Sequence, residues 1–427
     1  MSWFSDHADP GPGNPNGSLE MDKAENWLVR SDMLRIIKDA VSSNLEPDHL
    51  SYAHELGGPP GLLQTSASFF NRFFSPQVAV LPEHIVTGAG CASVLESLIF
   101  SICDLGDGLL LEAPMWAGFG VTSILRNNVR IIPVKYPRRP SSVEEFMRPY
   151  NDAMELAMCP IRGVIVCNPQ NPLGQIYPTE WLGALLQFCE NHDIHFISDE
   201  IYALSNFGVL RRSRDASNSN IVTGLESTFT SALAMDLKGL QVNPIRVHVA
   251  YSISKDLGSS GIRLGCLVIQ SNPEIRYALA VLNKYKVSNM ASIVATALFS
   301  NLQTLENILS RSKSCLRMAA EVVCGFLSFH GLSFYSPVAG CFIWARIGGE
   351  RATTETDAEL VEKLAAARVA LAAGFKFDGG EPGWFRLTFA LPREVLIEGL
   401  RRIEIAMEAK EHWKSDKEEL ARNWPCT

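Results

Sequence analysis

The stretch YSISKDLGSSGIRLG, residues 251–265, decides the fold that we predict for this chain. It overlaps the end of a short apolar run, VHVAY, and carries two cations, Lys255 and Arg263, eight residues apart among serines and glycines. Small residues let a backbone or a ligand approach closely, and they leave these cations little cover. Two such cations directly after a predicted strand indicate a ligand site.

Further apolar runs, separated by helix-like stretches, extend from about residue 85 to residue 270. They read HIVTGAG, GLLLEAP, VRIIPVKY, GVIVCNP, IHFISDE, VHVAYS and GCLVIQS. Short runs that end in polar residues or glycine are typical of a mostly parallel sheet covered on both faces. We therefore predict an α/β fold whose large lobe has a mostly parallel sheet with helices on both faces.

The rest of the chain predicts a second, smaller lobe. From about residue 300 the pattern is helical, with two strand-like pieces, CFIWARI and WFRLTFA, which indicates an α+β lobe. The segment at 409–424 has the pattern of a charged helix face. The predicted division is a flexible N-terminal arm at 1–18, a large domain at 51–300, and a small domain made of 19–50 and 301–427.

Composition narrows the choice of partners. The chain has 427 residues, 47% of them hydrophobic, and a formal net charge of −8, which gives no electrostatic reason to bind nucleic acid or an anionic membrane. No run approaches the roughly 20 apolar residues that span a bilayer. The ten cysteines show no CxxC pair and no zinc-ligand spacing. We expect reduced thiols, no metal, a cytoplasmic location and a small-molecule partner.

Polar residues gather at the predicted strand ends, in TGAGCAS, CNPQNPLG, SDEIYA and SISKD. The carboxyl ends of parallel strands share one rim of a sheet, where ligands bind. A lysine, an aspartate, a tyrosine, an asparagine and a glycine-rich turn before a helix are together what pyridoxal phosphate requires of a protein. The sequence therefore predicts a pyridoxal-phosphate site on this rim.

Each group has a separate chemical task. The Lys255 amine can form an imine with the cofactor aldehyde and then act as a base at the substrate Cα. Asp199 can keep the pyridine nitrogen protonated, and residues 88–92 with Arg263 can hold the phosphate. Singly, Lys255 would be a surface residue, Asp199 a helix cap, and the glycine turn a tight connection. The joint order of these residues at successive strand ends favours the cofactor site.

With these residues in place, the sequence resembles the fold type I pyridoxal-phosphate enzymes, and among them the 1-aminocyclopropane-1-carboxylate synthases. The resemblance covers nearly the whole chain. Its specific matches are AEN at 24–26, NPQNPLG at 168–174, SDEIYA at 198–203, RVHVAYSISKDLGSSGIRLG at 246–265 and EPGWFRLTFA at 381–390.

The resemblance implies roles for further residues, besides Lys255 as imine and base and Asp199 as partner of the ring nitrogen. Tyr202 and Asn171 would hydrogen-bond the phenolic oxygen of the cofactor, and Trp116 would stack on its ring. Arg386 would clamp the substrate α-carboxylate, and Glu25 would help to place the substrate. The phosphate cradle would consist of the backbone at Gly90 and Cys91 with Ser252 and Arg263.

Three departures from the family pattern concern the substrate and the partner subunit. The phosphate turn reads GAGC where the family usually has GGAT, and Met115–Trp116 replaces two tyrosines. SYAHELGGPPG departs from the family segment YHGLP, whose tyrosine reaches the partner's cofactor. The alignment allows Tyr52 or Leu56 at that position, of which we favour Tyr52. A tyrosine in this role implies a homodimer with shared active sites.

Three functions remain open. The first is a synthase-like lyase that deprotonates Cα and then eliminates, cyclises or substitutes at Cγ, with S-adenosylmethionine as the first candidate substrate. The second is a class I/II aminotransferase, because the same residues serve both reactions. The third is a non-catalytic binding or regulatory protein, which the joint presence of Lys255, Asp199, Tyr202 and Arg386 disfavours. The sequence leaves the amino acid substrate and its product open.

Overall fold

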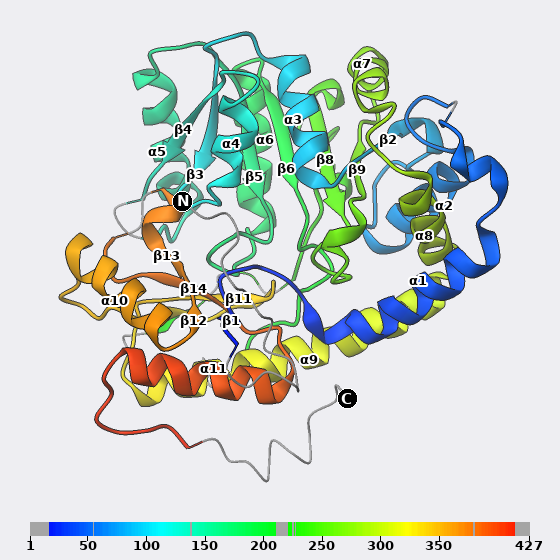
Figure 1. Cartoon of the computed structure of the whole chain (residues 1–427). Coiled ribbons are helices and arrows are strands. Elements are labelled where there is room, and N and C mark those ends of the chain that lie inside the picture. Colours follow the sequence, from blue (N-terminus) through cyan, green and yellow to red (C-terminus); the bar gives the residue numbers. More distant parts are fainter. Residues whose placement is uncertain are drawn as a thin grey trace.

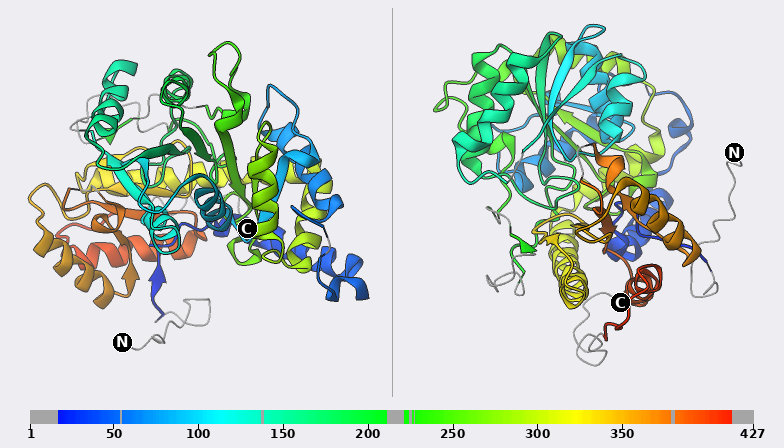
Figure 2. Two further views of the ribbon diagram at one scale, coloured as in Figure 1. Left: turned by 90° about the horizontal axis from the view of Figure 1, so that it is seen from above. Right: turned by 90° about the vertical axis from the view of Figure 1, so that its left-hand side faces the viewer.

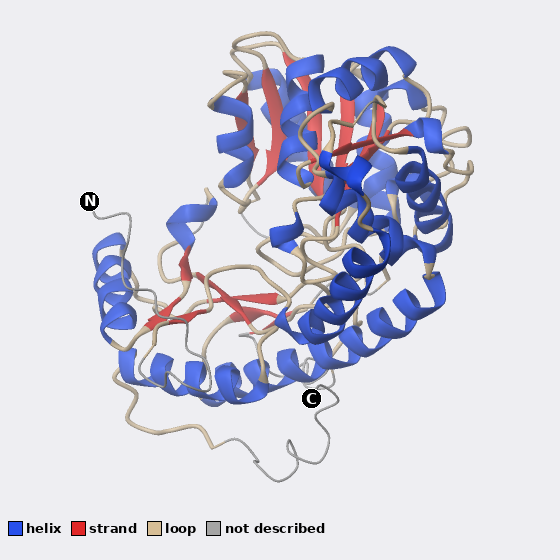
Figure 3. Cartoon of the chain, turned by 45° about the vertical axis from the view of Figure 1, so that its right-hand side comes forward, coloured by secondary structure: helices blue, strands red, loops and turns tan. Residues whose placement is uncertain are grey.

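The computed structural model describes residues 17–53, 55–136, 139–210, 221–223, 226, 228–378 and 381–414. Two lobes face each other, one built on a large sheet and the other on smaller sheets (Figures 1 and 3). The predicted α/β fold is confirmed. The domain boundaries at residues 18, 50 and 300 stay a prediction.

The large lobe contains a seven-stranded sheet with one antiparallel strand. All neighbours are parallel except β9, which runs antiparallel to both β2 and β8. The order across the sheet is β2 (Ile85–Gly88), β9 (Gly265–Val268), β8 (Val247–Ser252), β6 (His195–Asp199), β5 (Ile161–Cys167), β3 (Gly108–Glu112) and β4 (Arg130–Val134).

The reversed strand β9 joins three of the predicted motifs. In the register of the sheet, Gly265 lies opposite both Gly88, at the end of β2, and Ser252, at the end of β8. The glycine turn after β2, the lysine segment after β8 and the residues that precede β9 therefore meet at one rim. This register puts Arg263 beside the start of the helix that follows β2.

Side chains along the strands alternate between two hydrophobic cores, as the pleat requires. Leu109 and Leu111 point into one core and Leu110 points into the other. Figure 2 shows the sheet between two layers of helices, which confirms the coverage on both faces. The first core receives α3 (Cys91–Ile102), α4 (Gly118–Ile124) and α7 (Pro273–Asn283), and the second α2 (Pro60–Phe73), α5 (Val143–Leu156), α6 (Thr179–Asn191) and α8 (Asn289–Ser300).

The small lobe contains a five-stranded and a two-stranded sheet. The five-stranded order is β13 (Ala372–Ala373), β14 (Phe385–Thr388), β11 (Phe342–Ala345), β10 (Phe334–Tyr335) and β7 (Ile221–Val222), and β1 (Leu19–Glu20) pairs with β12 (Val369–Ala370). The two strand-like pieces predicted for this lobe are β11 and β14. Its helices are α10 (Thr354–Ala366) and α11 (Arg393–Ala406).

One long helix connects the lobes. Helix α9 (Leu302–Phe329) buries Leu305 and Ile308 in the second core of the large lobe, and Leu316 and Ala319 in the first core, which continues into the small lobe. Helix α1 (Arg30–Asn44) packs against α8. In Figure 1, α9 passes beneath the small sheet. Both lobes therefore pack against the same helix, α9.

Two expectations about composition meet different outcomes. Eight cysteines carry free thiols, but Cys315 is disulfide-bonded, so the expectation of reduced thiols throughout is wrong there. Among the described helices, none is long and apolar enough to cross a bilayer.

Residues 409–414 lie outside any helix, so the helix predicted at 409–424 is wrong for this part, and its remainder lies outside the described residues. The predicted arm lies outside them up to residue 16.

The junction of β2, β8 and β9 predicts that Gly265→Ala destabilises the protein. An added Cβ would lie 2.5 Å from the backbone carbon of Gly90, and backbone cannot move aside as a side chain can. Overpacking of this kind costs about 1–3 kcal/mol. The midpoint of thermal unfolding should fall. Gly261→Ala is the matched control, because its Cβ would meet open space, and an equal loss in both variants would contradict the prediction.

Candidate active site

The predicted site residues converge on a cavity of about 400 Å³ at the carboxyl ends of β5, β6 and β8. Two further walls come from the chain segment before α1 and from β14 of the small lobe. The cavity therefore lies between the lobes. Its lining includes Glu25, Cys91, Trp116, Asn171, Asp199, Tyr202, Lys255, Arg263 and Arg386.

Lys255 follows β8 and is largely buried. Its Nζ donates a hydrogen bond of 2.6 Å to the carbonyl of Ala24. Burial lowers the pKa of the Lys255 ammonium, because the charged form loses hydration. The neutral amine, which is the form that can act as nucleophile or base, is thereby easier to reach.

Asp199, at the end of β6, is a carboxyl group without a cationic hydrogen-bond partner among the described residues. It is 4% exposed, and its Oδ1 accepts from the Cys91 thiol at 3.2 Å and from the Ile201 amide at 3.3 Å. Burial raises the pKa of Asp199 to about 6. A protonated ring nitrogen would supply the missing positive charge, so this carboxyl group fits a pyridinium partner.

Arg386, on β14, presents an uncompensated positive charge to the cavity. The side chain is 5% exposed, and its two Nη atoms donate to the Asn171 amide oxygen at 2.8 Å and the Asp22 carbonyl at 2.6 Å. Its Nε has no partner within the described parts of the chain, and no ion pair reaches the guanidinium there. The Phe342 and Phe377 rings lie 5.1 and 5.0 Å from its Cζ. This environment fits a substrate carboxylate.

The turn after β2 and Arg263 form a cradle that excludes side chains. Arg263 has a left-handed backbone, with a φ of 61°, and donates to the Ser260 carbonyl at 2.6 Å and the Ala89 carbonyl at 2.7 Å. A Cβ at Gly90 would lie 2.2 Å from Arg263 Nη2. Gly90 immediately precedes α3, whose first amides open toward the rim. A small anion such as the cofactor phosphate fits this arrangement.

The two serines after β8 differ in their placement. Ser252 is buried, with its hydroxyl donating to the Leu264 carbonyl at 2.7 Å and bonded to the Ser254 hydroxyl at 2.7 Å. Ser254 lines the cavity, whereas Ser252 lies behind it. Ser254 is not among the predicted site residues, although the motif SISK contains both serines.

The chain segment before α1 crosses the cavity. Glu25 accepts from Arg30 and from the Ser260 hydroxyl, each at 2.5 Å. Burial alone would raise the pKa of Glu25, but these two partners hold it below its usual value. The carbonyls of Asp22 and Ala24, which contact Arg386 and Lys255, were also missed. Backbone carbonyls have no sequence signature.

Tyr202, Asn171 and Trp116 complete the lining. Tyr202 is 3% exposed, and its ring meets Phe342 edge-on at 5.2 Å. Trp116 is 37% exposed, and its ring centroid lies 5.5 Å from that of Phe119 in an edge-on arrangement. These positions are compatible with the hydrogen-bonding and stacking roles predicted for the three residues.

Tyr52 lies apart from this cavity. It is 82% exposed, and its ring centroid lies 5.7 Å from that of Tyr285. Together with His49 and Asn289 it lines a different pocket. Leu56, the alternative at this position, is 40% exposed. Within one chain neither residue reaches Lys255, and a role in the partner's site stays a prediction.

The cavity suits pyridoxal phosphate. Lys255, Asp199 and the cradle of Gly90 and Arg263 match its aldehyde, ring nitrogen and phosphate. The described residues contain no group of three or more His, Cys, Asp or Glu side chains that could hold a metal.

Comparison with known families and proteins agrees with this geometry. Residues 35–403 match the model of the family described as aminotransferase class I and II. A probable aminotransferase, gliI, of Aspergillus fumigatus is 41% identical over 400 residues, covering 90% of this chain and 88% of that protein. The aminotransferase verI of Clonostachys rogersoniana is 41% identical over 404 residues, covering 94% and 89%. A 1-aminocyclopropane-1-carboxylate synthase-like protein 1 of Bos taurus is 28% identical over 435 residues, covering 96% and 82%.

Solved structures share the fold. A Thermus thermophilus aspartate aminotransferase mutant complexed with tryptophan has a TM-score of 0.73 at 19% identity, covering 92% of this chain and 93% of that chain. An aromatic aminotransferase from Pyrococcus horikoshii has a TM-score of 0.72 at 19% identity, covering 92% and 95%.

The hydrogen bond from the Cys91 thiol to the Asp199 carboxylate predicts that Cys91→Ala weakens cofactor binding. Without this donor the carboxylate is harder to ionise and pairs less well with a ring cation. A hydrogen bond of this kind contributes about 0.5–1.5 kcal/mol, so the dissociation constant should rise about 2–10-fold in an absorbance titration. Cys91→Ser keeps a donor and should bind nearly as the natural protein does. Equal affinities of the alanine and serine variants would count against this role.

Proposed function

The chain belongs to the aminotransferase class I and II family, and we propose that it transfers the amino group of an α-amino acid to a 2-oxo acid. It is a pyridoxal-phosphate-dependent enzyme of the aminotransferase type. One observation carries the proposal: the Lys255 amine, the Asp199 carboxyl and the Arg386 guanidinium line a single cavity between the lobes. Relatives 41% identical to this chain are named aminotransferases, which supports transamination.

The substrate is held by its carboxylate in this proposal. Arg386 offers a planar fork whose present partners are neutral oxygens, so a carboxylate gains more from it than they do. A two-pronged contact fixes the direction of the carboxylate and hence which Cα bond faces the reacting groups. Trp116 and Phe119 form an aromatic wall of the same cavity.

The chemical step requires a base at Cα. Bound pyridoxal phosphate supplies an electron sink that makes the Cα proton acidic. Lys255 takes up that proton as a neutral amine, which its lowered pKa favours. With the cofactor bound, Asp199 would keep the ring nitrogen protonated, and Tyr202 and Asn171 would hydrogen-bond the phenolic oxygen.

A second candidate is the synthase-like reaction at Cγ, with S-adenosylmethionine as substrate. The matching AEN segment and the relatives 28% identical to this chain support it. One such relative, from Mus musculus, is named probable inactive. The chain is more similar to the fungal aminotransferases than to the synthase-like proteins, which supports transamination as the first candidate reaction and the lyase reaction as the second. The sequence motifs alone favour the opposite order.

We also propose a homodimer with shared sites. Tyr52 is exposed and remote from its own cavity, as a residue that completes a partner's site would be. An exposed tyrosine gains contact area at such an interface, where aromatic residues are enriched.

Lys255→Ala should lower turnover at least about 1,000-fold, because it removes both the imine-forming amine and the Cα base. The assay measures 2-oxo acid release from common L-amino acids, together with methylthioadenosine release from S-adenosylmethionine. Oxo acid alone would support transamination, and methylthioadenosine alone would support the lyase. Near-normal turnover in the variant would refute the assignment of Lys255.

Arg386→Lys should raise the KM for the amino acid about 10–100-fold, because a point charge replaces a two-pronged contact. Steady-state kinetics of the purified variant measure this change. The matched control is Arg72→Lys, an exposed arginine on α2 that pairs with Glu306. Unchanged kinetics in Arg386→Lys would place the carboxylate elsewhere.

A further inference from the structure

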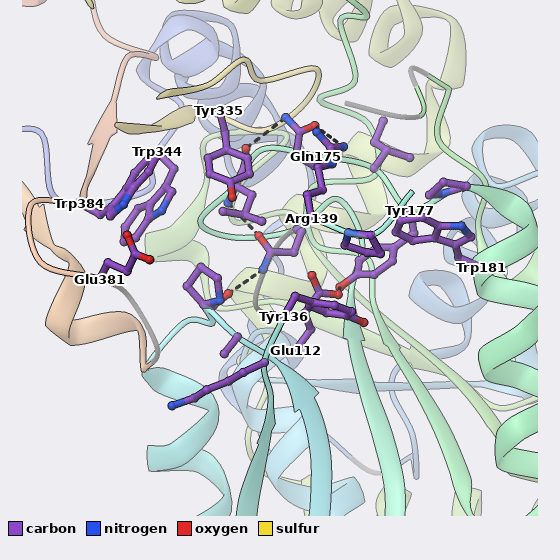
Figure 4. Close-up of a pocket in the computed structure, with 18 residues that line it drawn as sticks. Glu112, Tyr136, Arg139, Gln175, Tyr177, Trp181, Tyr335, Trp344, Glu381 and Trp384 are labelled. Atoms are coloured by element: carbon purple, nitrogen blue, oxygen red, sulfur yellow. Dashed lines mark hydrogen bonds between the residues drawn. The ribbon is translucent and has the colours of Figure 1, made fainter. Parts of the chain in front are cut away.

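A second cavity lies on the same rim of the large sheet, at the end of β3, which is the neighbour of β5. It has a volume of about 240 Å³ and shares no lining residue with the cavity of Lys255. Glu112, the last residue of β3, lies at its base (Figure 4). The opposite wall comes from the small lobe, through β10, β11 and the residues just before β14. None of its lining residues has a part in the proposed transamination.

Six aromatic side chains line its walls. Trp344 and Trp384 are stacked, with centroids 5.9 Å apart and an angle of 10° between the rings. Tyr335 lies 5.5 Å from Trp384. Figure 4 shows these three side chains on one side of the pocket and Tyr136, Tyr177 and Trp181 on the other. Such facing walls suit a flat or bulky apolar group.

Four charged side chains line the cavity. Lys135 and Glu381 are exposed to solvent, whereas Glu112 and Arg139, which are of opposite charge, are partly buried between the walls. Glu112 Oε2 accepts from the Tyr177 hydroxyl at 2.6 Å, and burial raises the pKa of Glu112 to about 7. Arg139 donates to the Thr223 carbonyl and, at 3.4 Å, to Gln175 Oε1. In the described parts of the chain no ion pair joins Glu112 to Arg139. Each side chain therefore hydrogen-bonds neutral groups only, and the two charges attract each other at longer range.

The size and charges limit the ligand. Sites for drug-sized ligands measure about 300–1,000 Å³, so 240 Å³ suits a molecule about as large as one amino acid. An anion alone would leave Glu112 without a counter-charge, and a cation alone would leave Arg139 without one. A zwitterion satisfies both side chains.

We propose that this cavity is a second ligand site that binds an aromatic α-amino acid as a zwitterion. The carboxylate pairs with Arg139, the ammonium pairs with Glu112, and the ring packs between the aromatic walls. Because Trp344 lies opposite Arg386 in the β11–β14 register, the ligand contacts the strand pair that carries the substrate arginine. The inference does not depend on transamination.

The test uses the holoenzyme and α-methyl-L-phenylalanine. This probe keeps both charged groups and the ring but has no Cα proton, so it is not turned over. Calorimetry should show a saturable site that persists in Arg386→Lys. Arg139→Gln and Glu112→Gln should each weaken that site at least about 10-fold, since each removes a charge-assisted hydrogen bond. Arg148→Gln, an exposed arginine on α5 outside the pocket, is the matched control and should leave it unchanged.

Derivatives of the probe test the same point without mutation. The amide lacks the carboxylate and the N-acetyl form lacks the ammonium, so each should bind the second site at least about 10-fold more weakly. Equal affinity of either derivative would overturn the proposal. So would the absence of saturable binding, or binding lost in Arg386→Lys and unchanged in Arg139→Gln. Oxo acid release is measured separately, so a failure here is distinct from a failure of the proposed reaction.

Discussion

The close approach of Gly90 and Gly265 is the constraint on which the active site depends. Strand β9 runs against its neighbours, so its first residue lies beside the ends of both β2 and β8. A Cβ at Gly265 would collide with the Gly90 backbone, so the first residue of β9 has to be glycine for the two segments to pass this closely. This contact sets the helix start after β2, the Arg263 side chain and the segment of Lys255 side by side. A cofactor that needs an amine and a phosphate cradle at fixed separation requires this junction.

Much of this arrangement could be predicted from local patterns. The apolar runs predict the strands of the large sheet. Because the carboxyl ends of parallel strands share one edge of the sheet, Asp199, Asn171 and Lys255 are then expected to lie close together. The helix predicted from the charged pattern is wrong at 409–414, because charge alternation alone does not supply an apolar face to hold a helix. The bond from Cys91 to Asp199 depends on tertiary register. The second cavity takes its walls from segments far apart in the chain, so no single motif predicts it.

The order of the two proposed reactions could not come from the motifs. Lysine, aspartate and the carboxylate-binding arginine provide carbanion chemistry, which transamination and elimination at Cγ share. The outcome depends on what surrounds the substrate side chain, and those walls include segments such as Met115–Trp116 that depart from the family pattern. Sequence identity over the whole chain includes the residues that surround the substrate side chain, whereas a short motif does not include them. The fungal relatives therefore weigh more than the AEN match.

Both cavities contain charged side chains that are bonded to neutral groups. Arg386 bonds an amide and a carbonyl, Asp199 a thiol and an amide, and Glu112 a phenol. A buried charge held in this way is a net cost to folding, because dipoles return only part of the lost hydration. A ligand of opposite charge meets a group that is already desolvated, so the attraction is not reduced by a second desolvation of the protein. Charges that weaken the fold are for this reason the best indication of where it binds its ligands.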